Sequence, residues 1–112
     1  MRGDETSRSA GGVTLRAELR DSTLELTVAG DLDMATALEL ETRLDAHLRA
    51  GGVNAVVLDL ARVGFIDSAG VGALVAIRER AQELGIDLTI TLVSDRVRRI
   101  LYLTGLGDIA EG

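Results

Sequence analysis

A run of apolar residues from Ala55 to Leu60 constrains the fold of this chain more than any other feature. Every position except Asp59 is apolar, so a strand built from this run is apolar on both faces, as is typical of the centre of a sheet with parallel strands. Apolar residues then recur at helical spacing from Val71 to Leu84. The sequence therefore predicts a strand, a turn and a helix in succession at the middle of the chain.

Two strands and a helix are expected before this unit. Apolar and polar residues alternate from Val13 to Arg20 and from Thr23 to Val28, and Asp21-Ser22 between them favours a tight turn. The pattern breaks at Gly30–Asp33, and a helix then follows until Gly51-Gly52. The residues expected on its buried face are Ala37, Leu40, Leu44 and Leu48.

One strand and a short helix are expected after Gly85, which ends the central helix. Leu88, Ile90 and Leu92 alternate with polar residues and predict the strand. Ser94 or Asp95 can cap the short helix. The residues expected to be buried are Leu74, Ile77, Ala81 and Leu84 in the central helix, and Val97, Ile100 and Leu101 in the short one.

This order of elements predicts one α/β domain over residues 13–112, after a disordered lead-in over residues 1–12 that is rich in glycine, serine, threonine and charge. The expected sheet is mixed and has four to five strands, with an N-terminal antiparallel hairpin, right-handed parallel crossovers and three helices. No internal repeat or linker is visible in the sequence.

The turn between the central strand and its helix carries Asp67-Ser68. Serine is strongly preferred at helix N-caps, so a structural cap is the simplest interpretation of Ser68. The glycines Gly70 and Gly72 follow, although glycine in a helix costs about 1 kcal/mol relative to alanine. They indicate either close access to the Ser68 hydroxyl, which a modifying enzyme or partner would need, or tight packing of the helix on the sheet.

Several segments, in this order, resemble a known family. They are Gly30–Ala37, Val57–Leu60 with Val63 and Phe65–Gly72, Gly85 before a strand pattern, Val97–Leu101, and Leu103–Leu106. The set resembles the STAS domains, and within them the stand-alone anti-sigma factor antagonists of bacteria, over roughly Val13 to Ile109. Many relatives continue into a final helix, so the end of this chain at Gly112 implies that the C-terminal helix is shortened or absent.

The resemblance implies that Ser68 is a phosphorylation site, with Ala69 where the family commonly has a second hydroxyl. It also implies that the unphosphorylated protein binds an anti-sigma factor, which is itself a serine kinase, and so releases a sigma factor. Phosphorylation of Ser68 by that kinase would switch binding off, and a phosphatase of the PP2C type would restore it. Such a protein regulates transcription, as in a stress response.

The strand ends that lead into helices usually carry the functional loops of such a sheet, so Gly30–Asp33 is expected to lie near Asp67–Gly72. Asp31, Asp33 and Asp67 would then form an acidic rim around the Ser68 hydroxyl. The expected partner-binding residues are Asp31, Asp33, Asp67, Ser68, Ala69, Gly70, Val71 and Gly72.

Other classes of function are disfavoured. A net charge of −6 and the lack of an apolar segment long enough for a signal peptide or a membrane span argue against nucleic-acid and membrane partners, and favour the cytoplasm. The single histidine, His47, has no nearby nucleophile, so neither an enzyme nor a cofactor is expected. The aspartates do not match a calcium loop, and Val75 stands where a dinucleotide motif needs its third glycine.

Two alternatives stay open. Arg96, Arg98 and Arg99 can form a docking patch, although a solvated helix face is the favoured interpretation. The whole domain can also be a scaffold or subunit domain, as in a transporter or a stress-signalling complex, with Ser68 serving only as a helix cap.

Overall fold

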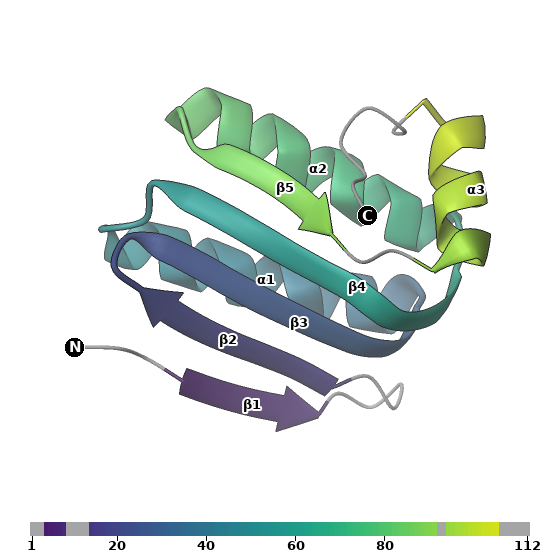
Figure 1. Ribbon diagram of the computed structural model, residues 1–112, viewed down its shortest axis with the longest axis horizontal. Helices are drawn as coiled ribbons and strands as arrows, with labels where there is room; N and C mark the ends of the chain where they lie inside the picture. The colour runs from purple at the N-terminus through teal and green to yellow at the C-terminus, as the bar shows by residue number, and fades with distance from the viewer. Residues whose placement is uncertain (1–3, 9–13, 92–93, 106–112) are drawn as a thin grey trace.

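The computed structural model describes residues 4–8, 14–91 and 94–105, which form one sheet and three helices (Figure 1). The strands are β1 (Asp4–Arg8), β2 (Thr14–Arg20), β3 (Thr23–Leu32), β4 (Ala55–Ile66) and β5 (Asp87–Thr91). The helices are α1 (Met34–Ala50), α2 (Ser68–Leu84) and α3 (Asp95–Leu103).

The five strands lie in the sheet in the order in which they occur in the chain. The pairs β1–β2 and β2–β3 are antiparallel, whereas β3–β4 and β4–β5 are parallel. Because the two parallel connections advance in the same direction across the sheet, their helices α1 and α2 lie on the same face (Figure 1). The predicted fold class, a mixed sheet with an N-terminal antiparallel hairpin and three helices, is confirmed.

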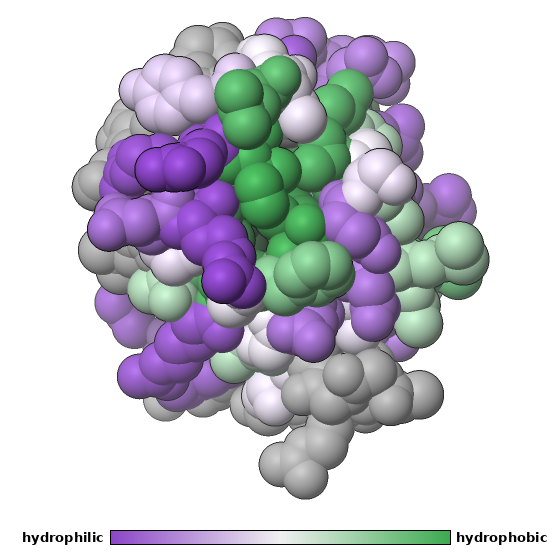
Figure 2. Space-filling model, turned by 90° about the vertical axis from the view of Figure 1, so that its right-hand side faces the viewer, coloured by the Kyte–Doolittle hydropathy of each residue, from purple (hydrophilic) through white to green (hydrophobic). Residues whose placement is uncertain are grey.

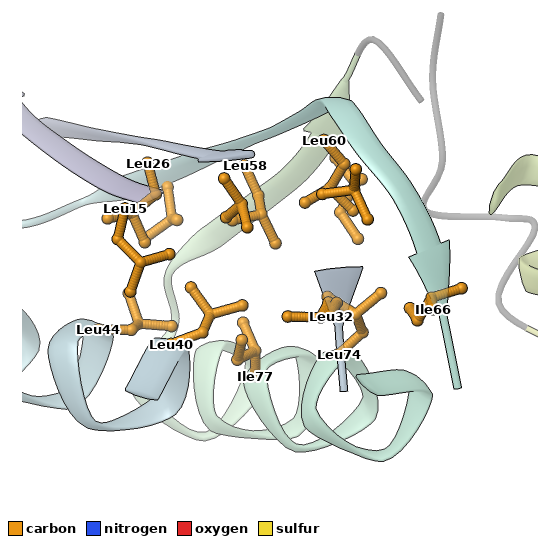
Figure 3. Close-up of a cluster of buried hydrophobic side chains, with 14 of the residues drawn as sticks. Leu15, Leu26, Leu32, Leu40, Leu44, Leu58, Leu60, Ile66, Leu74 and Ile77 are labelled. Carbon is orange, nitrogen blue, oxygen red and sulfur yellow. The ribbon is translucent and has the colours of Figure 1, made fainter. Parts of the chain in front are cut away.

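The core lies between this face of the sheet and the two helices (Figure 3). Leu26 on β3 and Leu58 on β4 point toward Leu40 on α1 and Ile77 on α2, as Figure 3 shows. α3 completes the core at one end of the sheet, where Val97 and Leu101 are fully buried.

Strand β4 is apolar on both faces but is fully covered on only one. Val56, Leu58 and Leu60 are buried, whereas Val57 and Asp59 are half-buried. The prediction that this run forms a central strand is confirmed, since β4 pairs with β3 on one side and with β5 on the other. Only one of its faces is fully covered, because the sequential strand order places both crossover helices on the same side (Figure 1).

Strand β1 lies within the segment expected to be disordered. Asp4–Arg8 pairs with β2 along its whole length, from Asp4 opposite Glu18 to Arg8 opposite Thr14. The expectation of a disordered lead-in is thus wrong for these five residues. Backbone groups of β2 would otherwise be unpaired at the edge of the sheet, and backbone pairing needs no apolar side-chain pattern. The other residues of the lead-in lie outside the described part of the chain.

Strands β3 and β4 continue past the points where their sequence patterns break. The register of their pairing shifts between Thr27 and Ala29 and again between Gly30 and Asp31. Gly30 has a φ of 115°, a conformation that residues with a side chain rarely adopt. These irregularities interrupt the alternation of buried residues but not the pairing, which reaches Leu32 and Ile66.

Most of the residues expected to be buried in the helices are buried. Ala37, Leu40 and Leu44 of α1 are buried, and Leu48 is partly buried against the core. In α2 the expectation is wrong for Leu84, which is 46% exposed because the helix ends there, at Gly85. Leu92 lies outside the described residues. None of the helices in the described ranges is long and apolar enough to cross a membrane.

Candidate functional site

Two turns meet at the end of the sheet where β3 and β4 lead into their helices (Figure 1). Asp31 lies opposite Phe65, and Leu32 lies opposite Ile66. The backbone N–H of Asp67 donates a hydrogen bond to the carbonyl of Leu32 at 3.4 Å. The structure thus brings together the two segments, Gly30–Asp33 and Asp67–Gly72, that the sequence singles out.

An aspartate caps each of the two helices at this end. In α2, Oδ1 of Asp67 accepts a hydrogen bond from the backbone N–H of Gly70 at 2.9 Å. In α1, Oδ1 of Asp33 accepts from the backbone N–H of Thr36 at 3.2 Å, and the Thr36 hydroxyl accepts from the Asp33 N–H at 2.8 Å. These bonds satisfy N–H groups that have no partner within the helix.

Ser68 is the first residue of α2 and its side chain is exposed. The interpretation of Ser68 as the helix cap is therefore wrong, because Asp67 holds that position one residue earlier. Aspartate and serine are equally favoured caps, so their order in the sequence could not decide between them. The hydroxyl of Ser68 is left at the surface, at the positively polarised end of a helix.

The two glycines of this turn differ in their surroundings. A Cβ atom on Gly70 would lie 2.3 Å from the carbonyl oxygen of Leu32 and 2.6 Å from Cγ1 of Ile66. A Cβ atom on Gly72 would have no neighbour within 4 Å. Tight packing therefore accounts for Gly70, and it does not account for Gly72, which leaves a bare surface one helical turn from Ser68.

The three aspartates of the expected acidic rim are placed differently. Asp33 and Asp67 are half-buried and bind helix N–H groups, whereas Asp31 is exposed. Within residues 4–8, 14–91 and 94–105, no three carboxylate or histidine side chains gather closely enough to hold a metal ion. Of the three aspartates, Asp31 is thus the one whose side chain is exposed at the surface.

Two exposed apolar side chains at this end of the molecule were not predicted from the sequence. Met34, the first residue of α1, is 74% exposed, and Phe65, near the end of β4, is 44% exposed. Figure 2 views the molecule from this end and shows apolar residues gathered in its middle, bordered by hydrophilic ones. Met34 directly follows the break in the pattern at Gly30–Asp33, and Phe65 directly follows Gly64. An apolar residue beside such a break is the sequence signal that could have predicted their exposure.

Helix α3 is attached beside the two turns. Ser94 is its N-cap and accepts a hydrogen bond from the backbone N–H of Val97 at 3.3 Å, which confirms one of the two expected caps. The Ser94 hydroxyl also donates to the carbonyl of Val63 in β4, at 3.3 Å. Ser94 thereby fixes the start of α3 close to the strand that leads to Ser68.

Removing the two neighbouring side chains Asp67 and Ser68 separately should have different effects. Asp67→Ala is expected to lower the free energy of unfolding by about 0.5–2 kcal/mol, because it removes the cap of α2. Ser68→Ala is expected to change it by less than about 0.5 kcal/mol, as for most exposed positions. Urea denaturation of both variants measures the difference, and an equal loss in both would contradict the assignment of the cap.

The fold and this site define a small α/β domain that presents an exposed serine where a parallel strand turns into a helix. The STAS domain family matches residues 14–111, and the chain belongs to that family. An anti-sigma-B factor antagonist of Staphylococcus aureus is 32% identical over 97 residues, covering 87% of this chain and 89% of the relative.

Solved structures of anti-sigma factor antagonists share the fold of this chain. An anti-sigma factor antagonist from Mycobacterium paratuberculosis is 28% identical, with a TM-score of 0.78, and the match covers 91% of this chain and 86% of the other. The anti-sigma factor antagonist SpoIIAA, in its unphosphorylated form, has a TM-score of 0.75 at 17% identity, and the match covers 98% of this chain and 88% of the other.

Proposed function

We propose that this protein is an anti-sigma factor antagonist whose binding is switched by phosphorylation of Ser68. The unphosphorylated form binds an anti-sigma factor with serine kinase activity in the cytoplasm and so releases a sigma factor. Phosphorylation by that kinase ends the interaction, and a PP2C-type phosphatase restores it. The observation that carries the proposal is the exposed Ser68 hydroxyl, which has no capping role because Asp67 caps the helix.

The added charge would act at the surface rather than on the fold. A phosphoryl group contributes roughly −1.5 to −2 charges at neutral pH. The N-terminus of α2 favours an anion by about 0.3–1 kcal/mol, and the aspartates of the two turns, Asp31, Asp33 and Asp67, oppose it. Since these influences are small and of opposite sign, the domain should stay folded, while a partner fitted to the free hydroxyl is repelled by charge and bulk.

The residues proposed for partner binding fall into two groups. Asp31, Ser68 and Gly72 are exposed and can touch a partner directly. The other five support this surface from below: Asp33 and Asp67 cap the helices, Gly70 is buried, and Ala69 and Val71 are half-buried. The bare backbone at Gly72 lets a partner approach α2 closely beside the hydroxyl.

Incubation with ATP and purified candidate anti-sigma kinases tests the proposal. Intact-mass measurement and peptide mapping should find one phosphate, located on Ser68, and none on the Ser68→Ala variant. If kinases that are active on other antagonists leave Ser68 unmodified, the switch is refuted. The domain would then be better explained as an unregulated scaffold or subunit domain.

A further inference from the structure

The outer face of α3 combines arginines with exposed apolar side chains. Arg96 and Arg99 are exposed, Tyr102 is 65% exposed and Leu103 is 80% exposed. Arg96, Arg99 and Leu103 follow one another at helical spacing, on the side of α3 opposite the buried Val97 and Leu101. Arginine and tyrosine are also the residues that most often dominate the binding energy of protein interfaces.

Among the residues that the structure describes, Arg96 and Arg99 differ from other arginines in having no partner. Arg20, Arg49 and Arg80 each form an ion pair with a carboxylate. Across the part of the chain that the structure describes, Arg96 and Arg99 have neither an ion pair nor a side-chain hydrogen bond. Both line a hollow of about 330 Å³ together with Asp95 and Ile100. Two arginines and only one carboxylate, that of Asp95, therefore line this hollow, which leaves it with a net positive lining that suits an acidic group.

The charges indicate the chemistry of the occupant. The chain as a whole carries −6, so it repels extended polyanions such as nucleic acid and anionic membranes. A short acidic segment needs only the local positive charge of α3. Tyr102 and Leu103 beside the arginines add apolar contact that a free phosphate could not use. An acidic protein segment that also carries apolar residues fits all of these features.

We propose that Arg96, Arg99, Tyr102 and Leu103, the α3 outer face, form a second docking surface for the anti-sigma factor. This inference rests on the proposed function. The hydrogen bond from Ser94 to Val63 holds α3 at the same end of the sheet as Ser68 (Figure 1), so one partner can cover both. The α3 outer face binds a segment of the partner that carries both acidic and apolar side chains. It does so in the phosphorylated and in the unphosphorylated state of Ser68.

Kinetics of Ser68 phosphorylation by the cognate kinase test this docking role. In the double variant Arg96→Glu/Arg99→Glu, KM is expected to rise roughly tenfold or more, because like charges then meet across the interface. The value of kcat should stay within about twofold, since a loss of binding shared by substrate and transition state raises KM alone. The affinity of the wild type should also fall with added salt more steeply than that of the variant.

The matched control is Arg20→Glu/Arg49→Glu, which changes the net charge equally but lies at the other end of the sheet. This control should keep the wild-type KM. Equal KM values for the wild type and both double variants would overturn the docking surface while leaving the proposed function intact. Thermal unfolding of all proteins checks that each variant is folded.

If no kinase modifies the wild type, the proposed function fails and the α3 outer face is tested by itself. The probe is a fluorescein-labelled amphipathic peptide of leucine and glutamate, with a leucine and lysine peptide as control. Binding of the acidic peptide alone, lost in Arg96→Glu/Arg99→Glu, would support the surface; no binding would refute it. Binding only after Asp108→Lys/Glu111→Lys would assign the surface to this chain's own acidic end and refute the proposal.

Discussion

Replacing Gly70 with alanine is expected to destabilise the domain by more than about 3 kcal/mol, beyond the usual range for an overfilled core position. The added Cβ would lie 2.3 Å from the Leu32 carbonyl oxygen. This oxygen belongs to the backbone, so it cannot relieve the clash by a change of side-chain rotamer. The start of α2 would have to move away from the end of β3. Such a loss is a large part of the total stability of a small domain, which is roughly 5–15 kcal/mol.

Gly72→Ala is the matched control, two residues along the same helix. It is expected to raise stability by about 0.5–1 kcal/mol, because alanine favours the helix and its Cβ meets open space. Urea denaturation of both variants gives the two free energies. A Gly70→Ala variant as stable as the wild type would show that the contact with Leu32 does not fix the position of α2.

Replacing Ser68 with aspartate is expected to weaken binding of the anti-sigma factor on the order of 100-fold, because repulsive charge within an interface costs several kcal/mol. The fold should be unaffected, since Ser68 is exposed and its side chain lies at the N-terminus of α2, which favours a negative charge. Isothermal titration calorimetry measures this change by comparing the Kd of the anti-sigma factor for the unphosphorylated wild type with its Kd for the Ser68→Asp variant.

Ser68→Asn separates the effect of charge from that of size. Asparagine has the shape of aspartate without its charge, so most of the wild-type affinity should remain. Ser68→Ala should bind without being switched. If the asparagine and aspartate variants lose affinity equally, the bulk of the side chain rather than its charge governs the switch. If both variants bind the anti-sigma factor as tightly as the wild type, Ser68 lies outside the interface.

The sequence predicted those elements whose side chains alone decide their structure. Alternation in Thr14–Arg20 and helical spacing in Met34–Ala50 each come from burial of one face, and both elements formed where expected. Strand β1 was missed because backbone pairing with β2 holds it, which leaves no apolar pattern. The continuation of β4 to Ile66 was missed because a register shift breaks the alternation.

The site shows a similar division. The sequence located the turn and the exposed serine, but it could not decide whether Asp67 or Ser68 caps α2, because both residue types suit the cap. Nor could it distinguish the roles of Gly70 and Gly72. That difference depends on the carbonyl of Leu32, which belongs to another strand and is far away in the sequence.

The strict sequential order of the strands has a consequence for biosynthesis. Each strand from β2 to β5 pairs with the strand synthesised just before it. The sheet can therefore add one strand at a time during translation, because no later strand has to insert between two earlier ones. Helix α3 is the exception, because its Val97 and Leu101 close a core formed by earlier elements. Nascent chains that have not yet released residues 95–103 should therefore expose apolar surface and attract chaperones.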